Sequence, residues 1–153
     1  MAGYFFDSSA LAKVYHPEIG STTVDRIVQE PSNRIQISRL TAVELPSVFA
    51  IKVRTNVITR EDSHALSRQF REDLVSGKFQ VFGLREAELN MAEHLIEQYA
   101  HDLRLRAMDA IQVAVALALK NQGSVDHFVT ADKVLCNVAA MEGFSVVNPE
   151  LGS

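Results

Sequence analysis

Five short apolar runs, separated by longer amphipathic segments, restrict the folds open to this chain more than any other feature. The runs are residues 4–6, 35–38, 79–82, 127–130 and 144–147. Their length and composition are typical of buried β-strands. Apolar residues recur at intervals of three and four in the segments 45–53, 66–74 and 91–99. This spacing predicts helices that pack one face on a sheet. Alternating strands and helices predict an α/β domain with a mainly parallel sheet covered on both faces.

Composition and net charge exclude several classes of protein for this chain. Of the 153 residues, 47% are hydrophobic and 22% are charged, as in a globular domain, and no linker or repeat divides them. We expect one domain over residues 1–150 and a short tail over 151–153. The longest apolar run, 113–119, is too short to span a bilayer, so no membrane contact is expected. A single cysteine and the lack of a signal sequence favour the reducing cytoplasm. The net charge of −4 disfavours a cationic protein that coats nucleic acids. It does not exclude a local basic surface that binds RNA.

Two acidic residues lie at the ends of predicted strands. Asp7 directly follows the first apolar run, and Asp132 comes two residues after the fourth. The carboxyl ends of parallel strands form one edge of the sheet, where open α/β proteins bind ligands. Either residue could instead cap the helix that follows it, because Asp is a favoured N-cap residue.

Glu44 lies just after the second predicted strand and could face the same edge. Residues 41–44 also fit a capping box, in which the Glu44 carboxylate would bond the backbone N–H of Thr41. Pro46 complicates either interpretation, because it removes a helical hydrogen bond and can kink the helix or shift its start.

Asp109 lies in the most apolar predicted helix. A helix that is apolar on almost every side is buried, and an ionised carboxylate inside it needs a partner. Arg106 could supply an ion pair, but an exposed pair at this spacing contributes only about 0.2–0.5 kcal/mol. We therefore predict a metal-binding or catalytic role for Asp109.

The four acids can converge on one cleft, because three follow parallel strands and the fourth enters from a buried helix. Crowded carboxylates repel one another, and a divalent cation would hold them ionised. Ligation by oxygen alone favours Mg²⁺ or Mn²⁺ over zinc. The five histidines are scattered without zinc-site spacing, and no glycine-rich phosphate loop is present.

Taken in order, four segments resemble the motifs of the PIN-domain ribonucleases, specifically the VapC-type toxins of type II toxin–antitoxin systems. They are residues 7–18 with Asp7 and Ser9, 38–45 with Glu44, 105–110 with Asp109, and 128–135 with Asp132. Residues 143–149 resemble the closing strand of that family. All four acidic positions are filled, which argues against an inactive member.

The resemblance implies a three-layer α/β/α domain with sheet order 3-2-1-4-5 and a metal-dependent endoribonuclease. Asp7, Asp109 and Asp132 would bind one or two Mg²⁺ or Mn²⁺ ions, and Glu44 would bind directly or through water. The products would carry a 5′ phosphate and a 3′ hydroxyl. Ser9 and Thr130 are candidate secondary polar contacts at this site, with local helix capping as the alternative.

The same resemblance implies partners. They are an RNA substrate, a cognate antitoxin and a second copy of the chain, within a larger toxin–antitoxin complex. A loop of structured RNA is favoured, because specific cleavage needs unstacked nucleotides. The candidates for a basic rim that meets the RNA are Lys13, Arg39, Lys52, Arg54, Arg60, Arg106 and Lys133.

Two other functions fit parts of the pattern. Aspartates at strand ends also suit another Mg²⁺-dependent phosphate hydrolase, such as a phosphatase. The chain lacks a second aspartate beside Asp7 that could protonate a leaving group, which counts against a phosphoaspartyl mechanism. The other alternative is a noncatalytic module that uses the fold only to bind RNA or the antitoxin.

Overall fold

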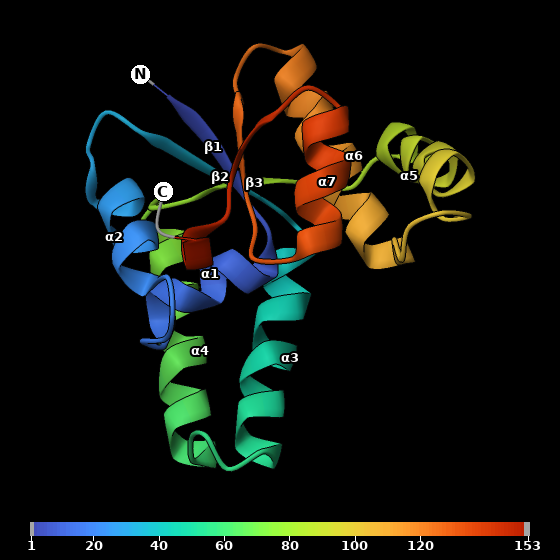
Figure 1. The fold of residues 1–153 in the computed structure, drawn as a ribbon. Coiled ribbons are helices and arrows are strands. Elements are labelled where there is room, and N and C mark those ends of the chain that lie inside the picture. The colour runs from blue at the N-terminus through green and yellow to red at the C-terminus, as the bar shows by residue number, and fades with distance from the viewer. Residues whose placement is uncertain (1, 152–153) are drawn as a thin grey trace.

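A computed structural model describes residues 2–151 and contains a parallel five-stranded sheet with the order β3-β2-β1-β4-β5 (Figure 1). All four strand pairs are parallel. The strands are β1 (Gly3–Phe6), β2 (Arg34–Ser38), β3 (Gln80–Phe82), β4 (His127–Val129) and β5 (Ser145–Val147). The expected fold class, strand order and five strands are confirmed, and the observed strand ends differ from the expected ones by at most one residue.

Helices cover both faces of the sheet (Figure 1). They are α1 (Ser8–Tyr15), α2 (Ser21–Gln29), α3 (Thr41–Arg54), α4 (Arg60–Val75), α5 (Glu86–Tyr99), α6 (Ala107–Asn121) and α7 (Lys133–Met141). The three segments with helical periodicity lie within α3, α4 and α5, and the apolar segment 107–119 lies within α6. Helix α2 was not expected from the sequence.

Two hydrophobic cores lie on opposite faces of the sheet. Phe5 packs with α5, α6 and α7, whereas its neighbour Phe6 packs with α1, α3 and α4. The same alternation recurs in β4, where Phe128 joins the first core and Val129 joins the second. Successive side chains of a strand point to opposite faces, so each central strand contributes to both cores. This arrangement produces the three layers.

Helices α3 and α4 form a hairpin that projects beyond the carboxyl edge of the sheet (Figure 1). Helix α3 begins at Thr41, with Leu40 as its N-cap, and continues through Pro46 to Arg54. Pro46 lines a hollow between α3 and α4 with Phe70 and Leu74, on the side of α3 that meets α4. The proline therefore neither ends the helix nor shifts its start beyond Thr41.

The end of the described chain is tied to α1. Pro149–Leu151 form a 3-10 helix, and the buried Lys13 side chain donates hydrogen bonds to Glu150 Oε2 at 2.8 Å and to the carbonyl of Ile19 at 2.7 Å. Of the expected tail, Leu151 ends this 3-10 helix, and residues 152–153 lie outside the described residues. No helix within residues 2–151 is both long enough and apolar enough to cross a bilayer.

Candidate active site

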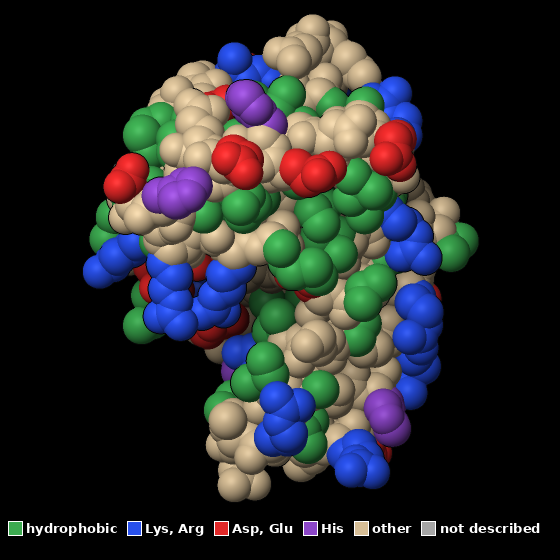
Figure 2. Space-filling model, turned by 90° about the vertical axis from the view of Figure 1, so that its right-hand side faces the viewer, with side chains coloured by type: hydrophobic (Ala, Val, Ile, Leu, Met, Phe, Trp, Pro, Cys, Tyr) green, Lys and Arg blue, Asp and Glu red, His purple; other side chains and the backbone are tan. Residues whose placement is uncertain are grey.

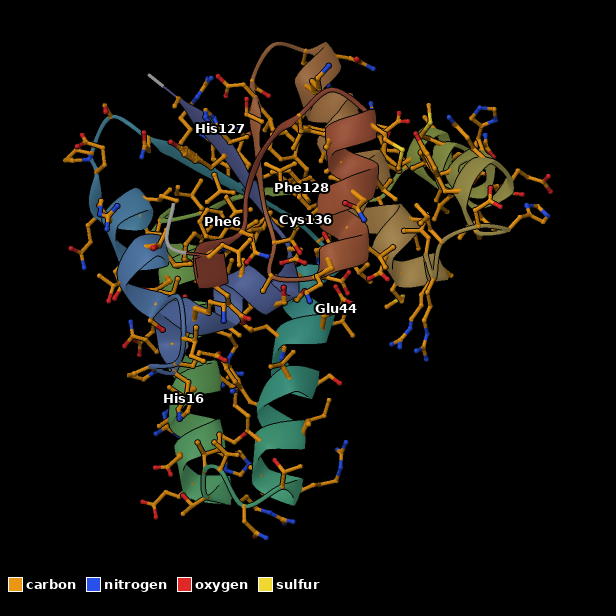
Figure 3. The ribbon with its side chains drawn as sticks, viewed as in Figure 1. Phe6, His16, Glu44, His127, Phe128 and Cys136 are labelled. Carbon is orange, nitrogen blue, oxygen red and sulfur yellow. The ribbon has the colours of Figure 1, made fainter. Side chains whose placement is uncertain are left out.

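The four predicted acids line one cleft at the carboxyl edge of the sheet. Asp7, Glu44, Asp109 and Asp132 share a cavity of about 400 Å³ with Ser8, Ser9 and Gln112. Asp7 follows β1 and Asp132 comes shortly after β4, so they flank the point where the strand order changes direction. Glu44 enters from the first turn of α3, at the end of the helix that lies near the sheet (Figure 3). Asp109 enters from the first turn of α6.

Asp7 is buried and surrounded by hydrogen-bond donors. It accepts from the backbone N–H of Ala10 at 2.9 Å, from Ser9 Oγ at 2.8 Å and from Thr130 Oγ1 at 2.5 Å. The side chain therefore caps α1 and lines the cleft at once, and the two roles are compatible. Burial raises the pKa of Asp7 to about 6, with a further contribution from the negative charge of Asp132, although the three donors oppose the shift.

Asp109 is half-buried, and its first-turn position directs it toward the other acids. Burial raises its pKa, and the charges of Asp132 and Glu44 raise it further. Its carboxylate accepts a long hydrogen bond, 3.4 Å, from the backbone N–H of Arg106. The Arg106 guanidinium lowers the pKa of Asp109, but within residues 2–151 the two side chains do not come within ion-pair distance. The ion-pair alternative is therefore not realised.

Glu44 makes contacts that differ from a capping box. Its Oε1 accepts hydrogen bonds from Ser8 Oγ at 2.8 Å and from Gln112 Nε2 at 2.6 Å. Because Leu40 rather than Thr41 is the N-cap of α3, the expected bond from Thr41 N–H to Glu44 is not formed, and the capping interpretation is wrong. Glu44 instead joins α3 to α1 and α6.

Asp132 is exposed at the N-terminus of α7. Its Oδ1 accepts from the backbone N–H of Leu135 at 3.0 Å, which makes it the N-cap of that helix. Capping occupies one carboxylate oxygen and leaves Asp132 on the wall of the cleft. As with Asp7, the cap holds the acid in place.

The two hydroxyl residues proposed as secondary contacts both bond Asp7. Thr130 is fully buried, donates to Asp7, and accepts from the backbone N–H of Asp132 at 3.0 Å. It thereby links the two acids. Ser9 is exposed, lines the cleft, and accepts from the backbone N–H of Ala131 at 3.3 Å. Ser9 lines the cleft, whereas Thr130 contacts Asp7 and Asp132 from outside its lining.

Sequence reasoning missed two polar residues of the cleft. The sequence does not single out Ser8, and Gln112 lies within the predicted helix that is apolar on almost every side. Both are buried and both donate to Glu44. The available signal for Gln112 was a polar side chain one turn after Asp109 on the same helix.

Apolar and basic side chains border the cleft. Val43, Ile51 and Met108 line it and are 64%, 47% and 42% exposed. Lys and Arg side chains gather beside the hollow above the α3–α4 hairpin, close to carboxylates (Figure 2). Among the basic-rim candidates, Arg106 and Lys133 are exposed next to cleft residues.

The prediction of a basic rim is wrong for two of its residues, Lys13 and Lys52. Lys13 is 2% exposed and pairs with Glu150, so it faces the interior. Lys52 lies 3.6 Å from Glu18 and is largely covered. Each lysine is paired with a carboxylate of this chain, so neither is free to meet an incoming phosphate.

The donor set fits a hard divalent cation. The cleft offers four carboxylates, and the pKa values of Asp7 and Asp109 rise partly because acidic neighbours repel their charges. A bound Mg²⁺ or Mn²⁺ would relieve that repulsion, and oxygen ligands are those that both ions prefer. Within residues 2–151 no three acidic, histidine or cysteine side chains are already close enough together to hold a metal ion. The fit therefore concerns donor chemistry, and binding would draw the carboxylates together.

Comparisons with known proteins agree with this geometry. A family model described as PIN domain matches residues 4–141. A search of curated proteins gives no sequence match. Three solved structures of similar fold each align over 95% of this chain and 97% of their own. They are a toxin–antitoxin complex from Klebsiella pneumoniae (18% identity, TM-score 0.62), the Sarcin-Ricin loop cleaving toxin VapC20 of Mycobacterium tuberculosis (15%, 0.66) and FitAcB of Neisseria gonorrhoeae (18%, 0.65).

At these identities the structural similarity is one of fold, whereas the family model covers most of the sequence. Within its span lie the sheet with the order 3-2-1-4-5 and the four acids at its carboxyl edge. The chain belongs to the PIN domain family.

Proposed function

We propose that the protein is a metal-dependent endoribonuclease of the VapC toxin type, which hydrolyses RNA phosphodiester bonds and is neutralised by an antitoxin. The observation that carries the proposal is the convergence of Asp7, Glu44, Asp109 and Asp132 on one cleft. Two of these acids have raised pKa values in the absence of a cation. Such a cluster costs folding free energy unless a ligand uses it.

Each residue would have a distinct part in the reaction. Asp7, Asp109 and Asp132 would hold one or two Mg²⁺ or Mn²⁺ ions, and Glu44 would contact the metal directly or through water. When bound, the cation supplies activation of water and stabilisation of charge on the attacked phosphate. Thr130 would hold Asp7 and Asp132 at fixed relative positions, because it forms a hydrogen bond with each of them. Ser9 faces the cleft, where its hydroxyl can contact a phosphate oxygen.

The names of the relatives support a class of substrate and a partner. VapC20 is described as cleaving the Sarcin-Ricin loop, and we extend this to a loop of structured RNA as the substrate of the present chain. One of the related structures is described as a toxin–antitoxin complex, which supports a cognate antitoxin here. A homodimer, a larger toxin–antitoxin complex and a cytoplasmic location complete the proposal.

The apolar border of the cleft supports a protein partner. Val43, Ile51 and Met108 leave apolar surface open beside the acids, and such patches commonly mark protein–protein contacts. An antitoxin segment seated there would cover the acids and compete with metal and RNA.

The direct test is cleavage of total bacterial RNA by the antitoxin-free protein with Mg²⁺ or Mn²⁺. We expect discrete fragments that disappear with EDTA and in Asp109→Asn. The matched control is Asp102→Asn, which changes an exposed carboxylate between α5 and α6 and should cleave like the unmodified protein.

Two outcomes would favour the alternatives. Equal RNA patterns with the active protein and Asp109→Asn, both verified as folded, would support the noncatalytic binding module. Metal-dependent turnover of a small phosphomonoester without RNA cleavage would support the other phosphate hydrolase.

A further inference from the structure

Gln112 is an uncharged polar side chain buried between three helices. It lies on α6, one turn after Asp109, and is 2% exposed. Its Nε2 donates to Glu44 Oε1 at 2.6 Å and to Thr41 Oγ1 at 3.1 Å, and lies 3.5 Å from Ser8 Oγ. The amide therefore joins α6 to the first turn of α3 and to the start of α1.

The hydrogen bonds that hold Glu44 go to only one of its two carboxylate oxygens among the described residues. Ser8 Oγ and Gln112 Nε2 both reach Oε1 of the carboxylate. Two donors on one oxygen fix the rotation of the group and direct Oε2 away from them. Glu44 consequently has one oxygen held by the protein and one available to a ligand in the cleft.

The orientation of the amide is itself specified. A carboxylate only accepts hydrogen bonds, so the NH₂ end of Gln112 must face Glu44. Gln112 Oε1 is buried and has no hydrogen-bond partner within residues 2–151. An unsatisfied buried acceptor is unfavourable and calls for a reason. The contact with Glu44 provides that reason.

We propose that Gln112 is a positioning residue, which together with Ser8 holds Glu44 beside Asp109 so that Glu44 Oε2 is presented to a divalent cation. The proposal rests on the proposed metal-dependent function. Asp109 and Glu44 carry like charges and would separate in the metal-free protein. Because Asp109 and Gln112 share one face of α6, the Gln112–Glu44 bond limits how far the two carboxylates separate before a cation draws the acids together.

The test is Mn²⁺ affinity, measured by calorimetry on the protein alone, in Gln112→Met. Methionine keeps the length and volume of glutamine but donates no hydrogen bond. We expect Mn²⁺ to bind roughly 10- to 100-fold more weakly, the usual effect of losing a partner of a metal ligand. The matched control is Gln36→Met. Gln36 is also fully buried, donates to the carbonyl of Ser124 at 2.7 Å and has an unpartnered Oε1, but it does not line the cleft.

A double-mutant cycle separates positioning from a general loss of structure. In Glu44→Gln the carboxylate is gone, so adding Gln112→Met should cause little further loss of Mn²⁺ affinity. Ser8→Ala removes the second donor and should weaken Mn²⁺ binding in the same direction, which keeps the test informative if Gln112→Met does not fold.

The outcomes distinguish this proposal from the proposed function. If the unmodified protein binds Mn²⁺ and Gln112→Met and Ser8→Ala bind it as tightly as Gln36→Met does, the positioning role is overturned and the proposed function stands. If the unmodified protein neither binds Mn²⁺ nor cleaves RNA, the proposed function fails and the positioning role fails with it.

Discussion

Asp7 combines a structural and a chemical role in one side chain. Its carboxylate caps α1 and accepts from Ser9 and Thr130, yet burial still raises its pKa to about 6. The hydrogen bonds therefore compensate for only part of the cost of placing the charge in the interior. A site that carries this cost in the metal-free state gains free energy when a cation binds.

The metal-free protein should become more stable when Asp7 is neutralised. The pKa of Asp7 is about 6 in the folded chain against 3.8 for the ordinary group, so the folded state retains a proton that the unfolded state has released. Its stability therefore falls as the pH rises from about 4 to about 6 and stays lower above that range. Asp7→Asn lacks this loss, and we expect it to be more stable by about 1–3 kcal/mol at neutral pH.

Urea denaturation in EDTA at several pH values measures this difference. The gain from Asp7→Asn should shrink toward zero as the pH falls below about 4, where Asp7 is protonated in both the folded and the unfolded state. Asp102→Asn, at an exposed loop position, should show no such gain. A loss of stability in Asp7→Asn at neutral pH would mean that the hydrogen bonds outweigh burial.

Sequence reasoning located the acids but not the groups that hold them. Asp7 and Asp132 were predicted from their positions after strands, which the chain order alone reveals. Gln112 had no apparent partner, because Ser8 and Glu44 are 104 and 68 residues away along the chain. Lys13 illustrates the same limit, since its partner Glu150 lies 137 residues away.

At the level of elements, the sheet was predictable because its strands are short, apolar and separated by helical periodicity. Helix α2 escaped detection because Ser21–Gln29 carries few apolar residues and buries only Thr23 and Val24. The first strand also depends on a close contact that no pattern reveals. A Cβ at Gly3 would lie 1.9 Å from the carbonyl oxygen of Ser124.

Gly3→Ala should therefore displace the turn that precedes β4. The clash is with backbone, which cannot rotate away, and we expect a loss of about 1–3 kcal/mol or more in the free energy of unfolding. Gly83→Ala is the matched control, because a Cβ there meets nothing within 4 Å and its φ is not in the left-handed region. Thermal or urea unfolding of the two variants checks the prediction, and equal stability would contradict it.

For the whole molecule, the net charge says little about the substrate until the positions of the charged side chains are known. The chain carries a net charge of −4, and its cleft is acidic, yet its proposed substrate is a polyanion. A cation among the carboxylates would reverse the local potential where the phosphate arrives. Exposed residues such as Arg106 and Lys133 would add to it, whereas Lys13 and Lys52 are neutralised internally.

The chemistry of the cut RNA ends tests the central claim most directly. RNA treated with the protein and Mn²⁺ would be captured in parallel by adapters that require a 5′ phosphate or a 5′ hydroxyl, with EDTA and Asp109→Asn as controls. Hydrolysis by water activated in the acidic cleft predicts 5′ phosphates and 3′ hydroxyls at discrete sites, lost in both controls. Ends with a 5′ hydroxyl and a 2′,3′-cyclic phosphate that persist in EDTA would contradict the account, because the ribose 2′ hydroxyl would then be the nucleophile and the four acids would have no part in the cut.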